Sequence, residues 1–252
     1  MEPIKDILGR VRSGILQQKP KPNSKEQNEM PEQVCPICKG GRFVHPLLPS
    51  GKPDYSTTVP CECAREQLEK ERLARMLKMC ELPVGTEHMT FENFKMRPGV
   101  QEAYDACLAL ADGEAEFFFL TLWSDTGRGK THLGVATVRR WLMRGVLARY
   151  AYVPLLLDEL RRGFRAEGDQ SYERRFDFYL NVPLLMLDDL GVESSTRWVQ
   201  QQLDTLVDHR LMNDLTTLVT TNLTMDELNF RIASRLQRRN GKVIVIDAAE
   251  FE

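Results

Sequence analysis

The chain has 252 residues, of which 42% are hydrophobic and 28% charged, and its formal net charge is −2. This length suits one core domain with a small additional module, and the charge excludes a strongly basic nucleic-acid coat but not a local basic stripe. No apolar run approaches the ~18 residues of a membrane-spanning helix, and the amino terminus lacks a signal-peptide pattern. We therefore expect a cytoplasmic protein without membrane association.

The amino-terminal segment, residues 1–33, is predicted to be an amphipathic helix followed by a flexible linker. Residues 17–33 are rich in Lys, Pro, Asn, Glu and Gln, as linkers are. The helix either folds back on the rest of the chain or docks in a groove of a partner protein. Its apolar positions, at helical spacing, are Ile4, Ile7, Leu8, Val11 and Ile15.

A four-cysteine module is predicted at residues 34–81. Its Gly- and Pro-rich sequence cannot build a hydrophobic core, so a bound zinc ion is expected to stabilise its fold. Four thiolates leave no open position for water on the zinc ion, so the module is not expected to be catalytic. We expect it to be a structural module that contacts a partner. His45 is an alternative ligand, and a disulfide is the competing interpretation, although nothing indicates an oxidising compartment. The predicted zinc ligands are Cys35, Cys38, Cys61 and Cys63, whereas core packing is expected for Cys80 and Cys107.

A glycine-rich loop lies between a predicted strand at residues 117–123 and a predicted helix that begins near His132. A strand, a loop that ends in Gly-Lys-Thr and a helix are the context of a phosphate-binding loop. Lys130 is predicted to reach the β- and γ-phosphates, and the Thr131 hydroxyl to bind Mg²⁺. A chance Gly-Lys-Thr at a helix start is the alternative, because Ser124 stands where the pattern has glycine. The predicted nucleotide-binding residues are Ser124, Thr126, Gly127, Arg128, Gly129, Lys130, Thr131 and His132.

Residues 155–175 combine arginines with aromatic residues, a composition that suits single-stranded nucleic acid. The alternative is an ordinary amphipathic helix pair with a solvated basic face. The expected buried positions are Leu155, Leu156, Leu160 and Phe164, and the interleaved aromatic residues are Tyr172, Phe176 and Tyr179. The candidate DNA-binding residues are Arg161, Arg162, Arg165, Arg174 and Arg175.

Polar residues follow two later predicted strands. The apolar run 182–187 ends in Asp188 and Asp189, and the run 216–221 ends in Asn222. Carboxylates at the end of a central strand lie beside the phosphate loop, where such enzymes hold Mg²⁺. Asp188 is the predicted magnesium ligand, and Asp189 is predicted to polarise the attacking water. Asn222 could hold that water or sense the γ-phosphate, although turn residues are the alternative at both positions.

Arg231 and Arg235 share one helix face. A guanidinium that reaches the γ-phosphate, often from a neighbouring subunit, stabilises the charge of the transition state. A solvated basic helix is the alternative interpretation.

Four motifs follow one another along the second part of the chain: Thr90–Phe94, Gly129–Leu133, Leu187–Gly191 and Thr220–Leu223. In this order and spacing they resemble AAA+ ATPases of the DnaC/DnaI type, the bacterial and phage loaders of the replicative helicase. IstB-type transposition helpers are similar in this core. The resemblance covers roughly residues 82–246 of a domain that we assign to residues 82–252. It implies a three-layer α/β fold with a parallel five-stranded sheet and no C-terminal lid.

The resemblance also implies roles for single residues. Asn222 corresponds to the first sensor of these ATPases, and Arg235 to the arginine finger that acts on ATP of the next subunit, with Arg231 as second candidate. Many relatives have glutamate where this chain has Asp189, so hydrolysis is expected to be slow. The implied catalytic residues are Lys130, Asp189, Asn222 and Arg235.

The expected function is ATP-dependent loading of a DnaB-type replicative helicase onto single-stranded DNA. The resemblance implies that the amino-terminal region grips the helicase and that subunits self-associate through the ATP site. It implies ATP, Mg²⁺ and Zn²⁺ as cofactors. The alternatives are a transposition helper that acts on duplex DNA and an adaptor switched by ATP with negligible hydrolysis.

Overall fold

The computed structural model describes residues 34–168, 171–193, 196–238 and 241–251. The chain divides into two compact units, one that ends at Arg75 and one that begins at Met76. The predicted amphipathic helix at residues 4–15 lies outside the described residues. Within the described ranges, no helix combines the length and the apolar character needed to cross a membrane.

The first unit contains a short hairpin and the first part of a helix. Strand β1 (Phe43–Val44) pairs antiparallel with β2 (Val59–Pro60), and helix α2 (Glu62–Cys80) follows directly. The Cys61 amide donates to the carbonyl of Arg42 over 2.8 Å, and the Arg42 guanidinium contacts the Glu71 carboxylate at 2.8 Å. These contacts hold the loop before β1 against the start of α2.

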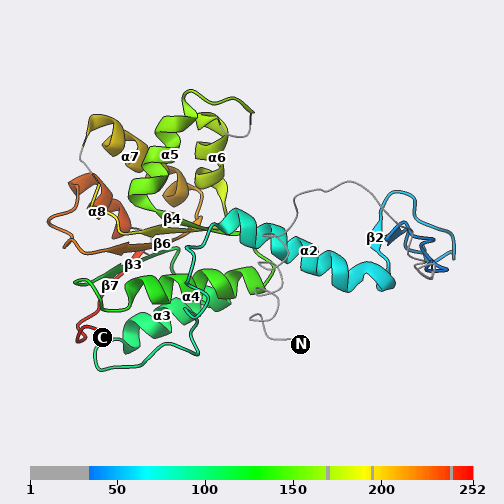
Figure 1. Ribbon diagram of the computed structural model, residues 1–252, viewed down its shortest axis with the longest axis horizontal. Helices are drawn as coiled ribbons and strands as arrows, with labels where there is room; N and C mark the ends of the chain where they lie inside the picture. Colours follow the sequence, from blue (N-terminus) through cyan, green and yellow to red (C-terminus); the bar gives the residue numbers. More distant parts are fainter. Residues whose placement is uncertain (1–33, 169–170, 194–195, 239–240, 252) are drawn as a thin grey trace, which may run out of the picture. The chain divides into compact units, whose positions relative to one another are not determined.

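The second unit is built on a five-stranded sheet in which every pairing is parallel (Figure 1). Its strand order is β4-β5-β6-β3-β7. The predicted α/β fold with a parallel five-stranded sheet is therefore confirmed. The strands are β3 (Phe119–Trp123), β4 (Ala148–Tyr152), β5 (Leu184–Asp188), β6 (Thr216–Thr221) and β7 (Gly241–Val245).

Helices cover both faces of this sheet (Figure 1). All five residues of β5 are buried, because a parallel strand between two helical layers is covered on both faces. Leu185 and Leu187 pack into the cluster that includes α5 to α8, whereas Met186 lies against Gly134 of α4. One layer holds α3 (Gln101–Asp112) and α4 (Lys130–Met143); the other holds α5 (Val153–Gly163), α6 (Tyr172–Asn181), α7 (Arg197–Met212) and α8 (Phe230–Leu236).

The buried face predicted for residues 155–164 was partly wrong. The side chains of Leu155 and Phe164 are each 58% exposed. Helix α5 begins at Val153, and Phe164 already lies at its C-cap, so the four predicted positions do not form one stripe. The buried stripe is Val153, Leu156, Leu157 and Leu160. The core positions predicted for Cys80 and Cys107 are confirmed, since both are fully buried.

A fully buried arginine, Arg210 of α7, joins three elements of the second unit. It donates to the carbonyls of Tyr179, Leu180 and Val182 over 2.9–3.1 Å, and to the Thr217 hydroxyl over 2.9 Å. A cation at the end of a helix satisfies carbonyls that have no partner within the helix. Arg210 thereby fixes the end of α6 against the start of β6.

We expect the Arg210→Met variant to lose about 2–4 kcal/mol of unfolding free energy, because buried carbonyls would lose their donors. Urea denaturation followed by circular dichroism measures this loss. Arg197→Met is the matched control, since Arg197 is exposed on the same helix, and it should stay within about 0.5 kcal/mol of the wild type. Equal stability of the two variants would contradict the structural role of Arg210.

Candidate nucleotide-binding site

The glycine-rich loop connects β3 to α4, as predicted. Gly129 is the N-cap of α4 and Lys130 its first residue, so the loop leads into the positive end of the helix dipole. Free backbone N–H groups at such a terminus bind phosphate. The predicted nucleotide-binding residues, Ser124 and Thr126–His132, all lie on this loop and the first turn of α4.

The Lys130 ammonium lies at the centre of the loop. It donates to the carbonyls of Ser124 and Asp125 over 2.6 and 2.8 Å, and to the amide oxygen of Asn222 over 2.7 Å. Burial lowers the pKa of Lys130, while the nearby Asp189 and Asp188 carboxylates oppose that shift. Ser124 adds a hydroxyl 3.1 Å from this ammonium, so the residue that replaces glycine takes part in the loop.

The Asp188 carboxylate, at the end of β5, accepts hydrogen bonds from hydroxyl groups of three different elements. It accepts hydrogen bonds from Thr131 of α4 over 3.1 Å, from Tyr150 of β4 over 2.7 Å and from Thr220 of β6 over 2.6 Å. The two predicted magnesium ligands, Thr131 and Asp188, are thus in direct contact. A carboxylate and a hydroxyl beside a phosphate loop are the donor set that P-loop enzymes use for Mg²⁺.

Asp189 follows in a left-handed backbone conformation with φ of 64°. Its amide donates to the Thr220 hydroxyl over 2.9 Å, and its carboxylate accepts from the Asn222 side chain over 2.8 Å. Burial, and then the charge of Asp188, raise the pKa of Asp189. Asn222 therefore bridges Lys130, which a γ-phosphate would contact, and Asp189, which an attacking water would contact.

The two candidate arginine fingers lie on α8, and both contact acidic residues of α7. Arg235 forms a two-pronged ion pair with Asp208, in which the Nη2–Oδ2 distance is 2.6 Å, and lies 3.8 Å from Asp204. The Arg231 side chain is 72% exposed and lies 3.6 Å from Asp204. In this subunit neither arginine contacts Lys130, Asp188 or Asp189 among the interactions of the described residues.

The four predicted zinc ligands come together in the first unit. Their sulfur atoms lie within 4.8 Å of one another, with separations of 3.8 Å for Cys35–Cys61 and 3.5 Å for Cys38–Cys63. Zn–S bonds of about 2.3 Å in a tetrahedron place sulfur atoms about 3.8 Å apart. The backbone N–H groups of Cys38 and Ile37 lower the pKa of Cys35 to about 6, which favours the metal-binding thiolate. The cluster therefore fits a structural zinc ion.

His45, the alternative zinc ligand, is engaged elsewhere in the first unit. Its Nδ1 atom lies 2.8 Å from the carbonyl oxygen of Thr57, and its ring packs edge-on against Tyr55. Among the described residues, the group of three or more His, Cys, Asp or Glu side chains that could hold a metal ion consists of the four cysteines.

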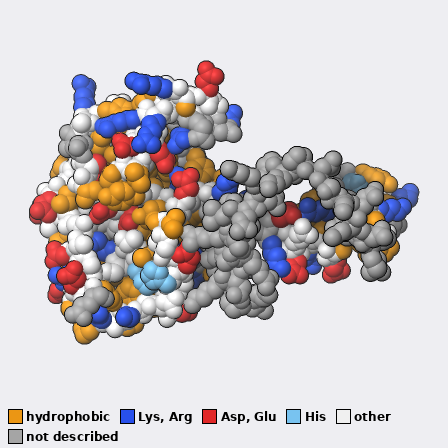
Figure 2. Space-filling model, viewed as in Figure 1, with side chains coloured by type: hydrophobic (Ala, Val, Ile, Leu, Met, Phe, Trp, Pro, Cys, Tyr) orange, Lys and Arg blue, Asp and Glu red, His pale blue; other side chains and the backbone are white. Residues whose placement is uncertain are grey.

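The predicted DNA-binding arginines lie on and around α5 and α6. Figure 2 shows basic side chains along this edge of the second unit, with hydrophobic side chains between them. Phe176 and Tyr179 are buried at 8% and 2% exposure, so these two predicted aromatic residues belong to the core. Exposed Phe164 instead stacks on Tyr172 at 4.4 Å, and the Arg161 guanidinium lies 4.9 Å from the Trp198 ring.

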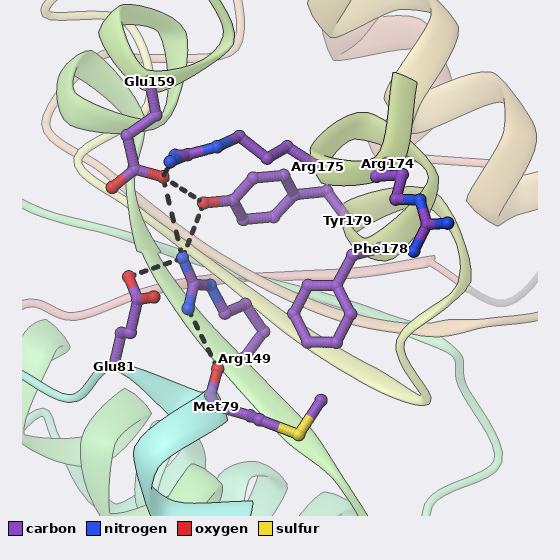
Figure 3. Close-up of a pocket in the computed structure, with 8 residues that line it drawn as sticks. All are labelled: Met79, Glu81, Arg149, Glu159, Arg174, Arg175, Phe178 and Tyr179. Atoms are coloured by element: carbon purple, nitrogen blue, oxygen red, sulfur yellow. Dashed lines mark hydrogen bonds and ion pairs between the residues drawn. The ribbon is translucent and has the colours of Figure 1, made fainter. Parts of the chain in front are cut away.

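Two of these arginines, Arg174 and Arg175, line a cavity of about 490 Å³ (Figure 3). Arg175 points into it and lies 3.4 Å from Glu159, whereas Arg174 points away from the ion network. The buried Arg149 of β4 lies beside them and contacts Glu81 at 2.6 Å and the Tyr179 hydroxyl at 2.8 Å. Arg175 therefore supports an ion network around Arg149, and Arg161, Arg162, Arg165 and Arg174 are the exposed members of the predicted set.

The sequence did not indicate Tyr150 as a residue of the site, and it indicated Thr220 only as the first residue of the motif Thr220–Leu223. Tyr150 is a strand residue without a motif, and its hydroxyl reaches Asp188 only because β4 and β5 are neighbours in the sheet. Thr220 carried a partial signal, because a hydroxyl inside a buried strand requires a partner.

We expect the Lys130→Ala variant to bind MgATP at least about 30-fold more weakly than the wild type, because a charged hydrogen bond to phosphate contributes about 2 kcal/mol or more. Isothermal titration calorimetry measures the change. Lys242→Ala is the control, since Lys242 lies at the opposite end of the sheet, in the first half of β7, and pairs with Glu102. Equal affinities in the two variants would remove Lys130 from the phosphate site.

Purified protein is expected to carry about one zinc ion per chain, and Cys61→Ser to lose it, because three thiolates bind Zn²⁺ more weakly than four. Elemental analysis by mass spectrometry measures the metal content. Cys107→Ala should retain the zinc, since Cys107 is buried in α3 of the second unit. Zinc at wild-type content in Cys61→Ser would contradict the four-cysteine site.

The comparisons with known proteins agree with this geometry. The family of IstB-like ATP binding proteins matches residues 55–233. The replicative helicase loader DnaI of Bacillus subtilis is 33% identical over 110 residues, which are 43% of this chain and 34% of DnaI. The replicative helicase loader DnaC of Escherichia coli K12 is 26% identical over 157 residues, 61% of this chain and 63% of DnaC. The chain thus spans less than two thirds of either relative.

A solved structure of DnaI superposes on this chain with a TM-score of 0.57 and 25% identity, covering 70% of this chain and 98% of the solved chain. The family match extends over most of the chain and includes the phosphate loop, the aspartate pair and Asn222. The chain therefore belongs to the IstB-like ATP-binding family, and its second unit is an AAA+ ATPase core of the DnaC/DnaI type.

Proposed function

We propose that this protein is an ATP-dependent loader of a DnaB-type replicative helicase onto single-stranded DNA. The observation that carries the proposal is that an AAA+ core, in which Lys130 contacts Asn222 and Thr131 contacts Asp188, occurs in one chain with a separate four-cysteine unit. The names of the relatives DnaI and DnaC, both replicative helicase loaders, support it.

The amino-terminal part is proposed to hold the helicase. The proposed helicase-binding part consists of the predicted amphipathic helix and linker at residues 1–33, which lie outside the described residues, and the proposed zinc module at residues 34–81. Residues 82–252 are the proposed ATPase domain. A zinc site closed by four thiolates has no position for substrate, so its use is structural. The exposed side chains Val34, Ile37 and Leu47, each at least two thirds exposed, give the module an apolar surface for a partner.

Single-stranded DNA is proposed to bind along α5 and α6. The exposed arginines Arg161, Arg162, Arg165 and Arg174 suit a phosphate backbone. The stacked pair Phe164 and Tyr172 offers an aromatic face for bases.

The same side chains suit hydrolysis of ATP. Lys130 would hold the β- and γ-phosphates, and Thr131 with Asp188 would hold Mg²⁺, which supplies charge neutralisation on the phosphates when bound. Asp189 and Asn222 would position and polarise the attacking water. Arg235 of a neighbouring subunit would stabilise charge on the γ-phosphate, which links turnover to self-association.

The family match favours a second candidate, an ATPase of the IstB-like type that helps a transposase on duplex DNA. The two functions differ in the nucleic acid that binds. Preference for single-stranded over duplex oligonucleotides of equal length, measured by fluorescence anisotropy, supports the loader, and the reverse preference supports the transposition helper.

We expect the full chain to capture the replicative helicase of its host, and nucleotide to change the amount captured. The matched variant lacks residues 1–75 and keeps Met76 and Cys80, which are buried in the second unit. This variant should bind ATP but not the helicase. Pull-down with purified proteins in ATP or ADP tests this expectation, and no capture with either nucleotide would contradict the loader.

The Arg235→Ala variant is expected to bind ATP within about threefold of the wild type but to lose more than about tenfold of its DNA- or partner-stimulated turnover. Phosphate release measures turnover, and thermal melting measures the effect of losing the Asp208 pair. The Arg231→Ala variant distinguishes the two arginines. If Arg235→Ala kept full stimulation and Arg231→Ala lost it, Arg231 and not Arg235 would be the arginine finger.

A further inference from the structure

The residues after β7, Asp247–Phe251, return to the phosphate loop, and we name them the C-terminal strap. The amide of Ile246 donates to the carbonyl of Trp123 over 2.9 Å, which continues the pairing of β7 with β3. At the end of the strap, the Phe251 amide donates to the carbonyl of Gly127 over 2.8 Å. The strap therefore begins beside the end of β3 and finishes on the loop itself.

Two arginines hold the strap by its backbone. Arg128 of the phosphate loop donates to the carbonyl of Ala248, and Arg97 donates to the carbonyl of Glu250 over 2.7 Å. The Arg97 guanidinium also lies 4.2 Å from the centre of the Phe251 ring. These contacts tie together three segments that are far apart in the sequence: the strap, the loop and the residues before α3.

Two glycines permit this close approach. A Cβ atom on Gly99 would lie 1.9 Å from the carbonyl oxygen of Asp247, and one on Gly127 would lie 2.7 Å from the Glu250 side chain. Both glycines have positive φ, 87° and 73°, a conformation that other residues rarely adopt. Glycine at these two positions, one before α3 and one in the phosphate loop, thus leaves room for the strap.

The strap adds an aromatic ring to one side of the loop. The Phe251 ring lies 5.7 Å from Phe94, which lies 5.1 Å from the ring of His132 in the first turn of α4. A Cβ atom on Gly129 would be 3.2 Å from Phe251. Phe94, His132 and Phe251 therefore form an aromatic wall beside the start of α4.

The strand order decides which end of a nucleotide would meet this wall. The phosphate loop follows β3, which lies between β6 and β7. Asp188 ends β5 and Asn222 follows β6 on one side, and the strap follows β7 on the other. Since the γ-phosphate and its magnesium ligands belong to the acidic side, a bound nucleoside triphosphate extends its nucleoside toward the strap.

We propose that the strap is a part of the nucleotide site and that Phe251, with Phe94, contacts the nucleoside of ATP. This inference rests on the proposed binding of ATP. Phe251 acts on the base or ribose, whereas the backbone bonds of the strap to Gly127 and Arg128 hold the loop in its phosphate-binding shape. Aromatic contact with a base favours binding because it removes the contacting surfaces of the ring and the base from water.

The test compares ATP with inorganic tripolyphosphate, which carries the same phosphates without a nucleoside. Calorimetry on the full chain with Mg²⁺ should show that Phe251→Ala weakens ATP binding by about 5- to 50-fold. Binding of tripolyphosphate should change by less than about threefold. Phe251→Tyr should restore ATP binding, and Phe43→Ala, an exposed phenylalanine of the first unit, should leave both ligands unaffected.

Three results would overturn the proposal, and a fourth would refute ATP binding itself. Equal weakening of ATP and tripolyphosphate in Phe251→Ala would mean that the ring does not contact the nucleoside. Unchanged or tighter binding of ATP would mean that the strap is not a wall of the site. A wild-type chain that binds tripolyphosphate but shows no preference for ATP would also refute the nucleoside contact, whereas a wild-type chain that binds neither ligand would refute ATP binding itself.

Discussion

The hydrogen bonding of one carboxylate, Asp188, constrains the arrangement of the ATPase core. Its oxygens accept from Thr131, Tyr150 and Thr220, which belong to a helix and to the two strands on either side of β5. A buried carboxylate is unfavourable unless hydrogen bonds replace its hydration. That requirement fixes β5 between β4 and β6 and sets the start of α4 above it, which brings the glycine-rich loop to the acidic residues.

The position of β3 between β6 and β7 then gives the loop two different flanks. On one flank, Asn222 joins Lys130 to Asp189, so the groups for phosphate, water and metal form one hydrogen-bonded set. On the other flank, the chain after β7 returns to Gly127 and carries an aromatic ring. Strand order therefore accounts for the proposed polarity of a bound nucleotide, with its phosphates toward the acidic residues and its nucleoside toward the strap.

The sequence predicted the parts of this site that are local. The phosphate loop and the aspartate pair could be found because their chemistry lies in consecutive residues, and the strand ends follow from apolar runs. Tyr150, Arg149 and the strap could not be found, because their partners are distant in sequence and meet only in the folded sheet. Helical spacing alone wrongly predicted that Phe164 is buried, because the spacing does not reveal where α5 ends.

The proposed role of Arg235 has a physical consequence for assembly. In one subunit its guanidinium is paired with Asp208 and lies near Asp204, so it is already oriented and partly neutralised. A neighbour's nucleotide can recruit Arg235 only by offering more negative charge than these two carboxylates. The γ-phosphate is the charge that ATP has and ADP lacks, so the exchange favours ATP. Under this proposal, the contact between α7 and α8 would make subunit association depend on the state of the nucleotide.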